Sequence, residues 1–328
     1  MVFLIIGITI AMSLAVGWSI GANDAANSLG TAVGSRVLNL KQAIILIALF
    51  GFLGASLQGS HVVATIGKGI VPMNELSKNN SRNIALIASF AACLWVVLAT
   101  HWKMPISTSH SIVGAVAGAG FAIAAPVKWK VLGDIFMCWI FTPVGAAILG
   151  YILFRILQNI LPRIIPRRYF KQALATLIVI SGCYVAYTWG ANDVANSIGV
   201  LAGAEIIPVK ICIILGGMAI VLGIVTWGYK VIETIGSEII HLSPIMAFSA
   251  QLASSLNVHI YTLMGIPVST SHSIVGAICG VGLVKGIRVL NMHIMRDIVL
   301  CWVATPFISG VISFVILKSI IFFMKMGG

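Results

Sequence analysis

Two decapeptides, GANDAANSLG at 21–30 and GANDVANSIG at 190–199, repeat the same polar side chains at the same spacing in a chain that is 59% hydrophobic. Eight of their ten positions are identical. A carboxylate at membrane depth is costly unless it faces a partner or water, so both copies are candidates for function. Carboxylate and amide oxygens are also the hard ligands that small cations prefer. We therefore predict a site for Na⁺ or another small cation, formed by Asn23, Asp24, Asn192 and Asp193.

A second pair of repeated segments carries hydroxyl groups. PISTSHSIVGAVAGAG at 105–120 recurs as PVSTSHSIVGAICGVG at 267–282, with twelve identities in sixteen positions. Proline before hydroxyl residues is typical of a helix start, and a helix N-terminus with hydroxyl groups binds oxyanions. We predict that an anion contacts Ser107, Thr108, Ser109, Ser269, Thr270 and Ser271 from these segments, together with Asn27, Ser28, Asn196 and Ser197 from the decapeptides.

Each pattern also has a structural explanation. Asn and Ser in the decapeptides would serve as polar contacts between helices, and Ser107 or Ser269 would serve as an ordinary helix cap. Two copies with identical spacing favour binding over helix contacts, and a cap needs only one of the several hydroxyls present. His110 and His272 are left open between proton transfer and simple packing.

The composition places these motifs in a membrane. Mean hydropathy is +1.08 and only 9% of the residues are charged, which is far too apolar for a water-soluble chain. A spanning helix needs roughly 20 mostly apolar residues. Ten segments approach that length, at about 1–20, 42–60, 83–101, 106–125, 131–157, 172–189, 209–228, 245–264, 267–284 and 297–320. We expect an all-α, multi-pass protein of the cell membrane, with the first segment retained rather than cleaved. The net charge of +12 then reflects topology and lipid headgroups rather than nucleic acid.

The repeats divide the chain into a duplicated unit. GDIFMCWIFTP at 133–143 also recurs, as RDIVLCWVATP at 296–306, and TIG at 65–67 recurs at 234–236. The predicted units are a first repeat at 1–158, a basic cytoplasmic linker at 159–171 and a second repeat at 172–328. Five apolar segments per half, or three with a re-entrant hairpin, give an odd number of crossings. Inverted repeats follow in either case. The glycines that flank the decapeptides suggest broken helices.

These paired motifs resemble the inorganic phosphate transporter family, and the resemblance covers both halves. It implies re-entrant hairpins bearing the Ser/Thr motif, phosphate as substrate, Na⁺ or H⁺ as coupling ion and a homodimer. The expected function is therefore phosphate symport, with no cofactor besides the coupling ion. A sulfate permease of the same fold and an anion channel are the alternatives. An enzyme is not expected, since the chain lacks HExxH and GxSxG. The absence of GxxxxGK[ST] argues against nucleotide-driven transport.

Overall fold

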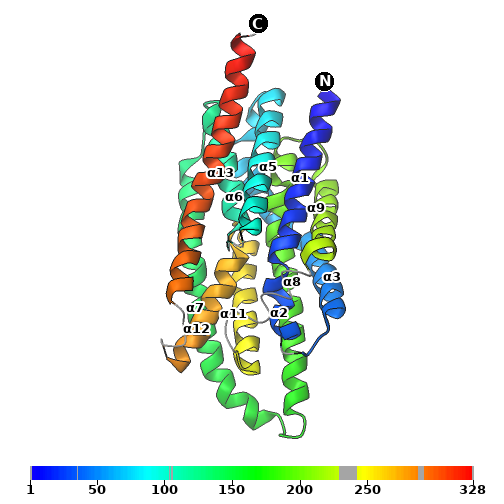
Figure 1. The fold of residues 1–328 in the computed structure, drawn as a ribbon, viewed down its shortest axis with the longest axis vertical. Helices are drawn as coiled ribbons and strands as arrows, with labels where there is room; N and C mark the ends of the chain where they lie inside the picture. The colour runs from blue at the N-terminus through cyan, green and yellow to red at the C-terminus, as the bar shows by residue number, and fades with distance from the viewer. Residues whose placement is uncertain are drawn as a thin grey trace.

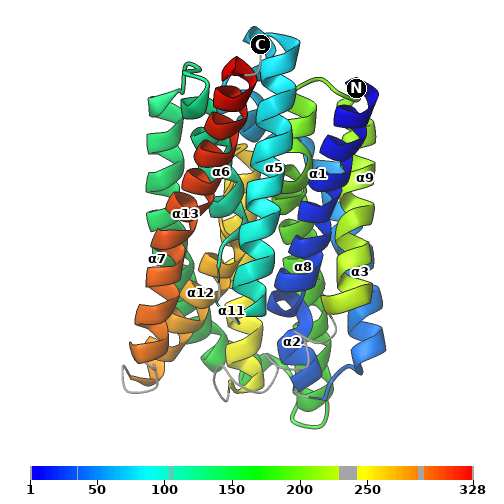
Figure 2. The same ribbon diagram turned by 45° about the horizontal axis from the view of Figure 1, so that its top comes forward.

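The computed structural model describes residues 2–34, 36–102, 104, 106–228, 242–286 and 292–326. Within these ranges the chain forms helices and no strands. Seven of the described helical segments are long and apolar enough to cross a membrane. Both termini lie at one end of the bundle, and the connection at 165–169 lies at the other end, which we call the linker end (Figure 1 and Figure 2). The chain is therefore a multi-pass membrane protein.

The first half begins with α1 (Val2–Asp24) and α2 (Ala26–Gly34), which descend toward the linker end. The chain returns through α3 (Leu40–Gln58), α4 (Ser60–Ala64) and η1 (Thr65–Gly69), and the short η2 (Met73–Glu75) follows. A hairpin of α5 (Lys78–His101) and α6 (Thr108–Ala122) comes next, and α7 (Trp129–Ile164) leads back to the linker. Asn39 caps α3 in a reciprocal capping box, and Ser77 caps α5.

The second half repeats this order. It consists of α8 (Phe170–Gly203), α9 (Val209–Gly223) with η3 (Ile224–Gly228), the hairpin of α11 (Pro244–Leu263) and α12 (Thr270–Lys285), and α13 (Met292–Met326). Ser243 caps α11, whose first residue is a proline, as is common at helix starts. The second TIG segment, 234–236, lies outside the described residues.

The two hairpins enter the bundle from opposite ends. In Figure 1, α5 and α6 occupy the upper part of the molecule, and α11 and α12 occupy the lower part. With 15 and 16 residues, α6 and α12 are shorter than the roughly 20 residues that a crossing requires. The segments expected at 106–125 and 267–284 are thus the short inner arms of hairpins rather than full crossings.

Each hairpin packs against the other half. Helix α6 contacts α13, and α12 contacts α7. In the same crossed manner α3 packs on α8, and α9 packs on α1. Because every pair joins one half to the other, neither half buries its own apolar faces alone.

The predicted helix breaks differ from the observed ones. The first decapeptide contains a break of one residue, at Ala25 between α1 and α2, whereas α8 continues through the whole second decapeptide. The prediction of an unwound second motif is therefore wrong. Gly21 and Gly190 serve close packing instead: a Cβ on Gly21 would collide with the Ile220 carbonyl oxygen, and one on Gly190 with that of Gly51.

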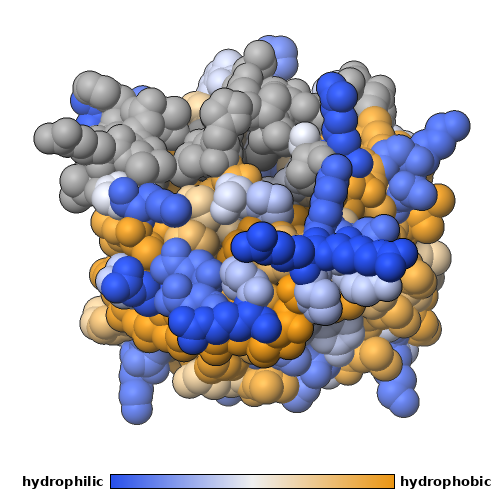
Figure 3. Space-filling model, turned by 90° about the horizontal axis from the view of Figure 1, so that it is seen from below, coloured by the Kyte–Doolittle hydropathy of each residue, from blue (hydrophilic) through white to orange (hydrophobic). Residues whose placement is uncertain are grey.

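The linker end carries exposed basic side chains over an apolar body. Figure 3 looks onto this end and shows hydrophilic side chains spread across it. Arg163, Arg167, Arg168 and Lys171 are all exposed. By the positive-inside rule this end remains the predicted cytoplasmic face.

Candidate functional site

The two decapeptides and the two hairpin tips meet inside the bundle. Asp24 is the last residue of α1, and Asp193 lies within α8. Thr108 and Thr270 are the first residues of α6 and α12. Both aspartates are almost fully buried, at 2% and 1% exposure, although they carry the motif's only charge.

Asp24 accepts hydrogen bonds from three side chains. Asn23 Nδ2 donates to its Oδ1 at 3.0 Å, and Thr108 Oγ1 donates to its Oδ2 at 3.4 Å. Ser271, from the other half, donates to Oδ1 at 3.4 Å. One carboxylate therefore contacts both hairpins.

Asp193 has a matching environment. Thr270 Oγ1 donates to its Oδ2 at 3.2 Å, and Asn196 Nδ2 donates to its Oδ1 at 3.2 Å. The same Asn196 amide donates to Ser109 Oγ of the opposite hairpin at 2.9 Å. Since Thr270 and Ser271 are neighbours on α12, consecutive residues contact the two aspartates.

The remaining asparagines connect helices around this centre. Asn27 Nδ2 donates to Ser271 Oγ at 3.1 Å, as Asn196 does to Ser109. Asn192 is fully buried, donates to Thr262 Oγ1 at 3.0 Å and accepts from the Val268 amide at 3.2 Å. The Asn196 Oδ1 atom has no hydrogen-bond partner among the described residues, which leaves a buried acceptor free for a ligand.

The Ser107 and Ser269 hydroxyls are helix caps. Ser107 Oγ accepts from the His110 amide at 3.3 Å, and Ser269 Oγ accepts from the His272 amide at 3.1 Å. The structural explanation considered for these two serines is thus present. Capping does not account for the hydroxyls of Thr108, Ser109, Thr270 and Ser271. These four reach the decapeptides or the facing hairpin. Pro105 lies outside the described residues.

Two predicted residues do not join the cluster. Ser197 Oγ donates to the Ser13 carbonyl oxygen of α1 at 2.8 Å and so serves a contact between helices. The Ser28 hydroxyl is buried without a hydrogen-bond partner among the described residues, and the Ser28 carbonyl accepts from Gln251 Nε2 at 2.9 Å. The structure therefore gives Ser197 a contact between helices and leaves the Ser28 hydroxyl without a partner among the described residues.

The histidines form a ring stack between the hairpin tips. His110 and His272 are in edge contact, with ring centroids 4.4 Å apart. His110 stacks on Trp139 at 3.6 Å, and His272 stacks on Trp302 at 3.5 Å. Their Nδ1 atoms lie 3.0 Å and 3.4 Å from the Trp302 and Trp139 carbonyl oxygens, so each Nδ1 must carry the proton. The packing alternative is thus observed.

Sequence reasoning missed four residues around this centre. Thr100 and Thr262 hydrogen-bond Asn23 and Asn192, at 3.2 Å and 3.0 Å. Each threonine lies seven residues before the capping serine of its half, so extending the second repeat backward would have found both. Trp139 and Trp302, from the stack described above, lie in the repeated CWxxTP segments, which gave no chemical signal of their own.

The centre combines two kinds of binding chemistry. Both aspartates lack a basic partner among the described residues, whose ion pairs are Lys68–Glu205 and Arg296–Asp297, both exposed. Two buried negative charges without basic partners attract cations. The N-termini of α6 and α12 offer backbone amides and hydroxyls to an anion. The arrangement can therefore bind an oxyanion and small cations together.

Comparison with known proteins gives consistent matches. The model of a phosphate transporter family matches residues 20–313. A Pyrococcus furiosus protein, named provisionally as a phosphate permease, is 31% identical over 90% of this chain and 91% of its own length. A chloroplast protein of Arabidopsis thaliana, named inorganic phosphate transporter 2-1, is 27% identical over 84% of this chain and 65% of its own. A solved structure described as the sodium-dependent phosphate transporter superposes with a TM-score of 0.86 at 28% identity, covering 97% of this chain and 99% of that one.

Proposed function

The chain belongs to the phosphate transporter family, and from this premise we propose that it is a secondary active symporter of inorganic phosphate driven by a Na⁺ gradient. The observation that carries the proposal is the convergence of Asp24 and Asp193 with the N-termini of α6 and α12. A site shared by two halves that enter from opposite ends suits alternating access.

Cations occupy the decapeptide side of the site in this proposal. Asn23 and Asp24 supply oxygens for one Na⁺, and Asn192 and Asp193 supply them for another. The hydrogen bonds that reach the carboxylates come from amide N–H and hydroxyl donors. The solved structure that superposes on this chain is described as sodium-dependent, which supports Na⁺ as the coupling ion of this proposal.

Phosphate occupies the hairpin side. When Na⁺ replaces the hydrogen bonds that the aspartates now accept, the hydroxyls of Thr108, Thr270 and Ser271 turn to donate to phosphate oxygens. Ser109, in exchange for its bond to the Val268 carbonyl oxygen, and backbone amides at the two helix starts complete the set of donors. Ser107 and Ser269 shape those starts as caps, and Asn27 and Asn196 orient the serines they contact. Bound Na⁺ would offset the repulsion between phosphate and the aspartates.

The proposed architecture is a pair of inverted repeats. The crossed packing of α6 on α13 and of α12 on α7 supports it, as does the entry of the two hairpins from opposite ends. A structural comparison of the halves would relate them by a two-fold axis in the membrane plane. Assembly into a homodimer is carried over from the family resemblance.

Uptake into proteoliposomes tests the proposal. Purified protein is reconstituted, and entry of radiolabelled phosphate is followed under an inward Na⁺ gradient, an inward H⁺ gradient or neither. We expect saturable uptake above that of protein-free liposomes only with the Na⁺ gradient. Uptake driven by H⁺ alone would overturn the choice of ion, and non-saturable flux would indicate a channel.

A further inference from the structure

The two copies of the site differ in their exposure. Asn23, Asn27 and Ser271, which surround Asp24, are partly exposed. The counterparts of the two asparagines, Asn192 and Asn196, are 0% exposed, and Ser109, the counterpart of Ser271, is 1% exposed. One copy of the site is thus partly accessible, and the other copy is fully buried.

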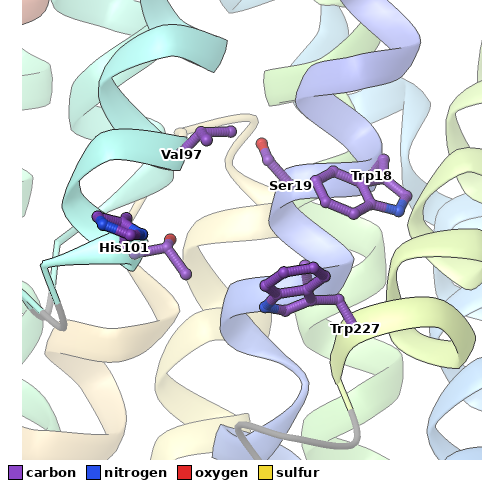
Figure 4. Close-up of a pocket in the computed structure, with 7 residues that line it drawn as sticks. Trp18, Ser19, Val97, His101 and Trp227 are labelled. Carbon is purple, nitrogen blue, oxygen red and sulfur yellow. The ribbon is translucent and has the colours of Figure 1, made fainter.

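A cavity of about 180 Å³ adjoins the exposed side. Its walls come from α1, the inner end of α5 and η3, and are formed by Trp18, Ser19, Ala22, Val97, Thr100, His101 and Trp227 (Figure 4). Thr100 hydrogen-bonds Asn23, which in turn hydrogen-bonds Asp24. Two hydrogen bonds therefore connect the cavity wall to the carboxylate.

The cavity lies on the linker side of the first hairpin. Val97 and His101 belong to the inner end of α5, whose outer end points away from the linker. Helix α9 and η3 run from the opposite end toward the linker end, and Trp227 is in their last turn. The cavity therefore lies beside the inner ends of α5 and η3, both of which point toward the linker end.

Equivalent positions in the other half can be assigned from the repeats. Counting from the decapeptides, Trp18 corresponds to Tyr187 and Ser19 to Thr188. Counting back from the Ser/Thr motifs, Val97 corresponds to His259. Gly51 and Ile220 make the matching contacts with Gly190 and Gly21. Gln58 and Trp227, each seven residues further along, therefore correspond as well.

Where the first half has a cavity, the second half has a chain of hydrogen bonds. Tyr184 Oη donates to His259 Nδ1 at 2.7 Å, and His259 Nε2 donates to Gln58 Oε1 at 2.8 Å. A second hydrogen bond between the same two halves runs from Thr65 Oγ1 to the Gly265 carbonyl oxygen at 2.6 Å. These bonds join α3 and η1 to α8 and the tip of the second hairpin.

We propose that the cavity is the route between the linker end and the site, and that Tyr184, His259 and Gln58 form the closed gate of the matching route from the opposite end. The inference rests on the proposed transport function for what passes through, since a symporter must open one route at a time. The polar gate suits this task, because its hydrogen bonds can exchange for water when the route opens.

Thiol labelling from each side tests the gate. Ser19→Cys places a thiol at the cavity wall, and Thr188→Cys places one at the equivalent position behind the gate. Both parent hydroxyls are buried and donate to the carbonyl three residues earlier, so the two variants are closely matched. A small, charged methanethiosulfonate reagent is added to one side of oriented vesicles without phosphate or Na⁺. Mass spectrometry of the specific peptide separates each new thiol from the six native cysteines.

We expect Ser19→Cys to react from the linker side at least about tenfold faster than Thr188→Cys reacts from the opposite side, as for a route closed in most molecules. Adding Gln58→Ala to Thr188→Cys should raise its labelling severalfold. His259→Val, which installs the residue of the matching position, should do the same. The control is Trp227→Ala, at the counterpart of Gln58, which should leave Thr188→Cys labelling unchanged.

Equal labelling of the two cysteines, or no response of Thr188→Cys to either gate variant, would overturn the inference. Labelling needs no phosphate, so its outcome is independent of the proposed substrate. A chain that labels as expected but carries no phosphate would contradict the proposed function alone.

Discussion

Ser271 of the second hairpin donates a hydrogen bond to Asp24 of the first half, across 3.4 Å. The same hydroxyl accepts from Asn27 at 3.1 Å, so a single serine connects two decapeptide side chains to the opposite repeat. This contact means that neither half contains a complete site. In the proposed transporter, both halves must therefore be assembled before phosphate can bind.

Removal of this hydroxyl should weaken phosphate binding. Loss of a hydrogen bond to a charged group costs about 1.5–3 kcal/mol, so Ser271→Ala should raise the KM for phosphate roughly tenfold to a hundredfold. Ser109→Ala, at the counterpart position, should have a similar effect. Uptake kinetics in proteoliposomes measure both. Thr9→Val is the control, because Thr9 lies on α1 and donates only to the Ile5 carbonyl oxygen. An unchanged KM in both serine variants would remove these hydroxyls from the phosphate site.

Neutralising the aspartates should act on the cation. Asp24→Asn and Asp193→Asn keep the size of the side chain and remove its charge, so the dependence of uptake on Na⁺ should weaken more than protein folding. Uptake is measured against Na⁺ concentration for each variant and for the double variant. Size-exclusion profiles and thermal unfolding provide the control for folding. Normal Na⁺ dependence in a well-folded double variant would refute the cation assignment.

Phosphate should be preferred over sulfate. Near neutral pH phosphate keeps at least one P–OH donor, whereas sulfate has none, and an ionised carboxylate only accepts. An aspartate oxygen facing sulfate would be left unmatched, at a cost of about 1–3 kcal/mol, or roughly one to two decades of affinity. Competition against labelled phosphate uptake measures this difference. Equal inhibition by sulfate and by unlabelled phosphate would contradict this preference, because it would mean that bound Na⁺ leaves no aspartate oxygen facing the anion.

A methyl group at Gly190 should destabilise the protein. Its Cβ would collide with the Gly51 backbone, so α3 and α8 would have to separate, at a cost of about 1–3 kcal/mol. The melting temperature of the purified protein should fall in Gly190→Ala. Gly7→Ala is the matched control, since Gly7 lies in α1 with nothing within 4 Å of an added Cβ. Equal melting temperatures for the two variants would show that the contact between α3 and α8 accommodates the added methyl group without loss of stability.

Much of this site follows from the sequence because the duplication marks it. Identical spacing identified both aspartates and the hydroxyls of Thr108, Ser109, Thr270 and Ser271, and the structure brings all of them together in one centre, buried except for the partly exposed Ser271. Hydropathy identified the apolar segments but could not tell a crossing helix from the inner arm of a hairpin. That distinction depends on where α6 and α12 begin, which is set by packing against the other half.

Other features of the site could not be predicted from the repeated sequences. The prediction of an unwound turn at Gly190 is wrong because the sequence does not distinguish a glycine needed for backbone flexibility from one needed for close helix packing. Ser197 shares the motif's spacing but donates to the Ser13 carbonyl oxygen of α1, and the Ser28 hydroxyl has no partner among the described residues. The pairing of each histidine with one tryptophan ring and the other tryptophan's carbonyl depends on tertiary structure alone.

Equilibrium binding of phosphate to the purified protein tests the central claim most directly. Radiolabelled phosphate is titrated onto the detergent-solubilised chain in Na⁺ and, at equal ionic strength, in choline. The account predicts one saturable phosphate site per chain that is tight in Na⁺ and at least about tenfold weaker in choline, since two uncompensated carboxylates would then repel the anion. Phosphate binding of equal affinity in Na⁺ and choline would contradict a site shared by phosphate and its coupling cation.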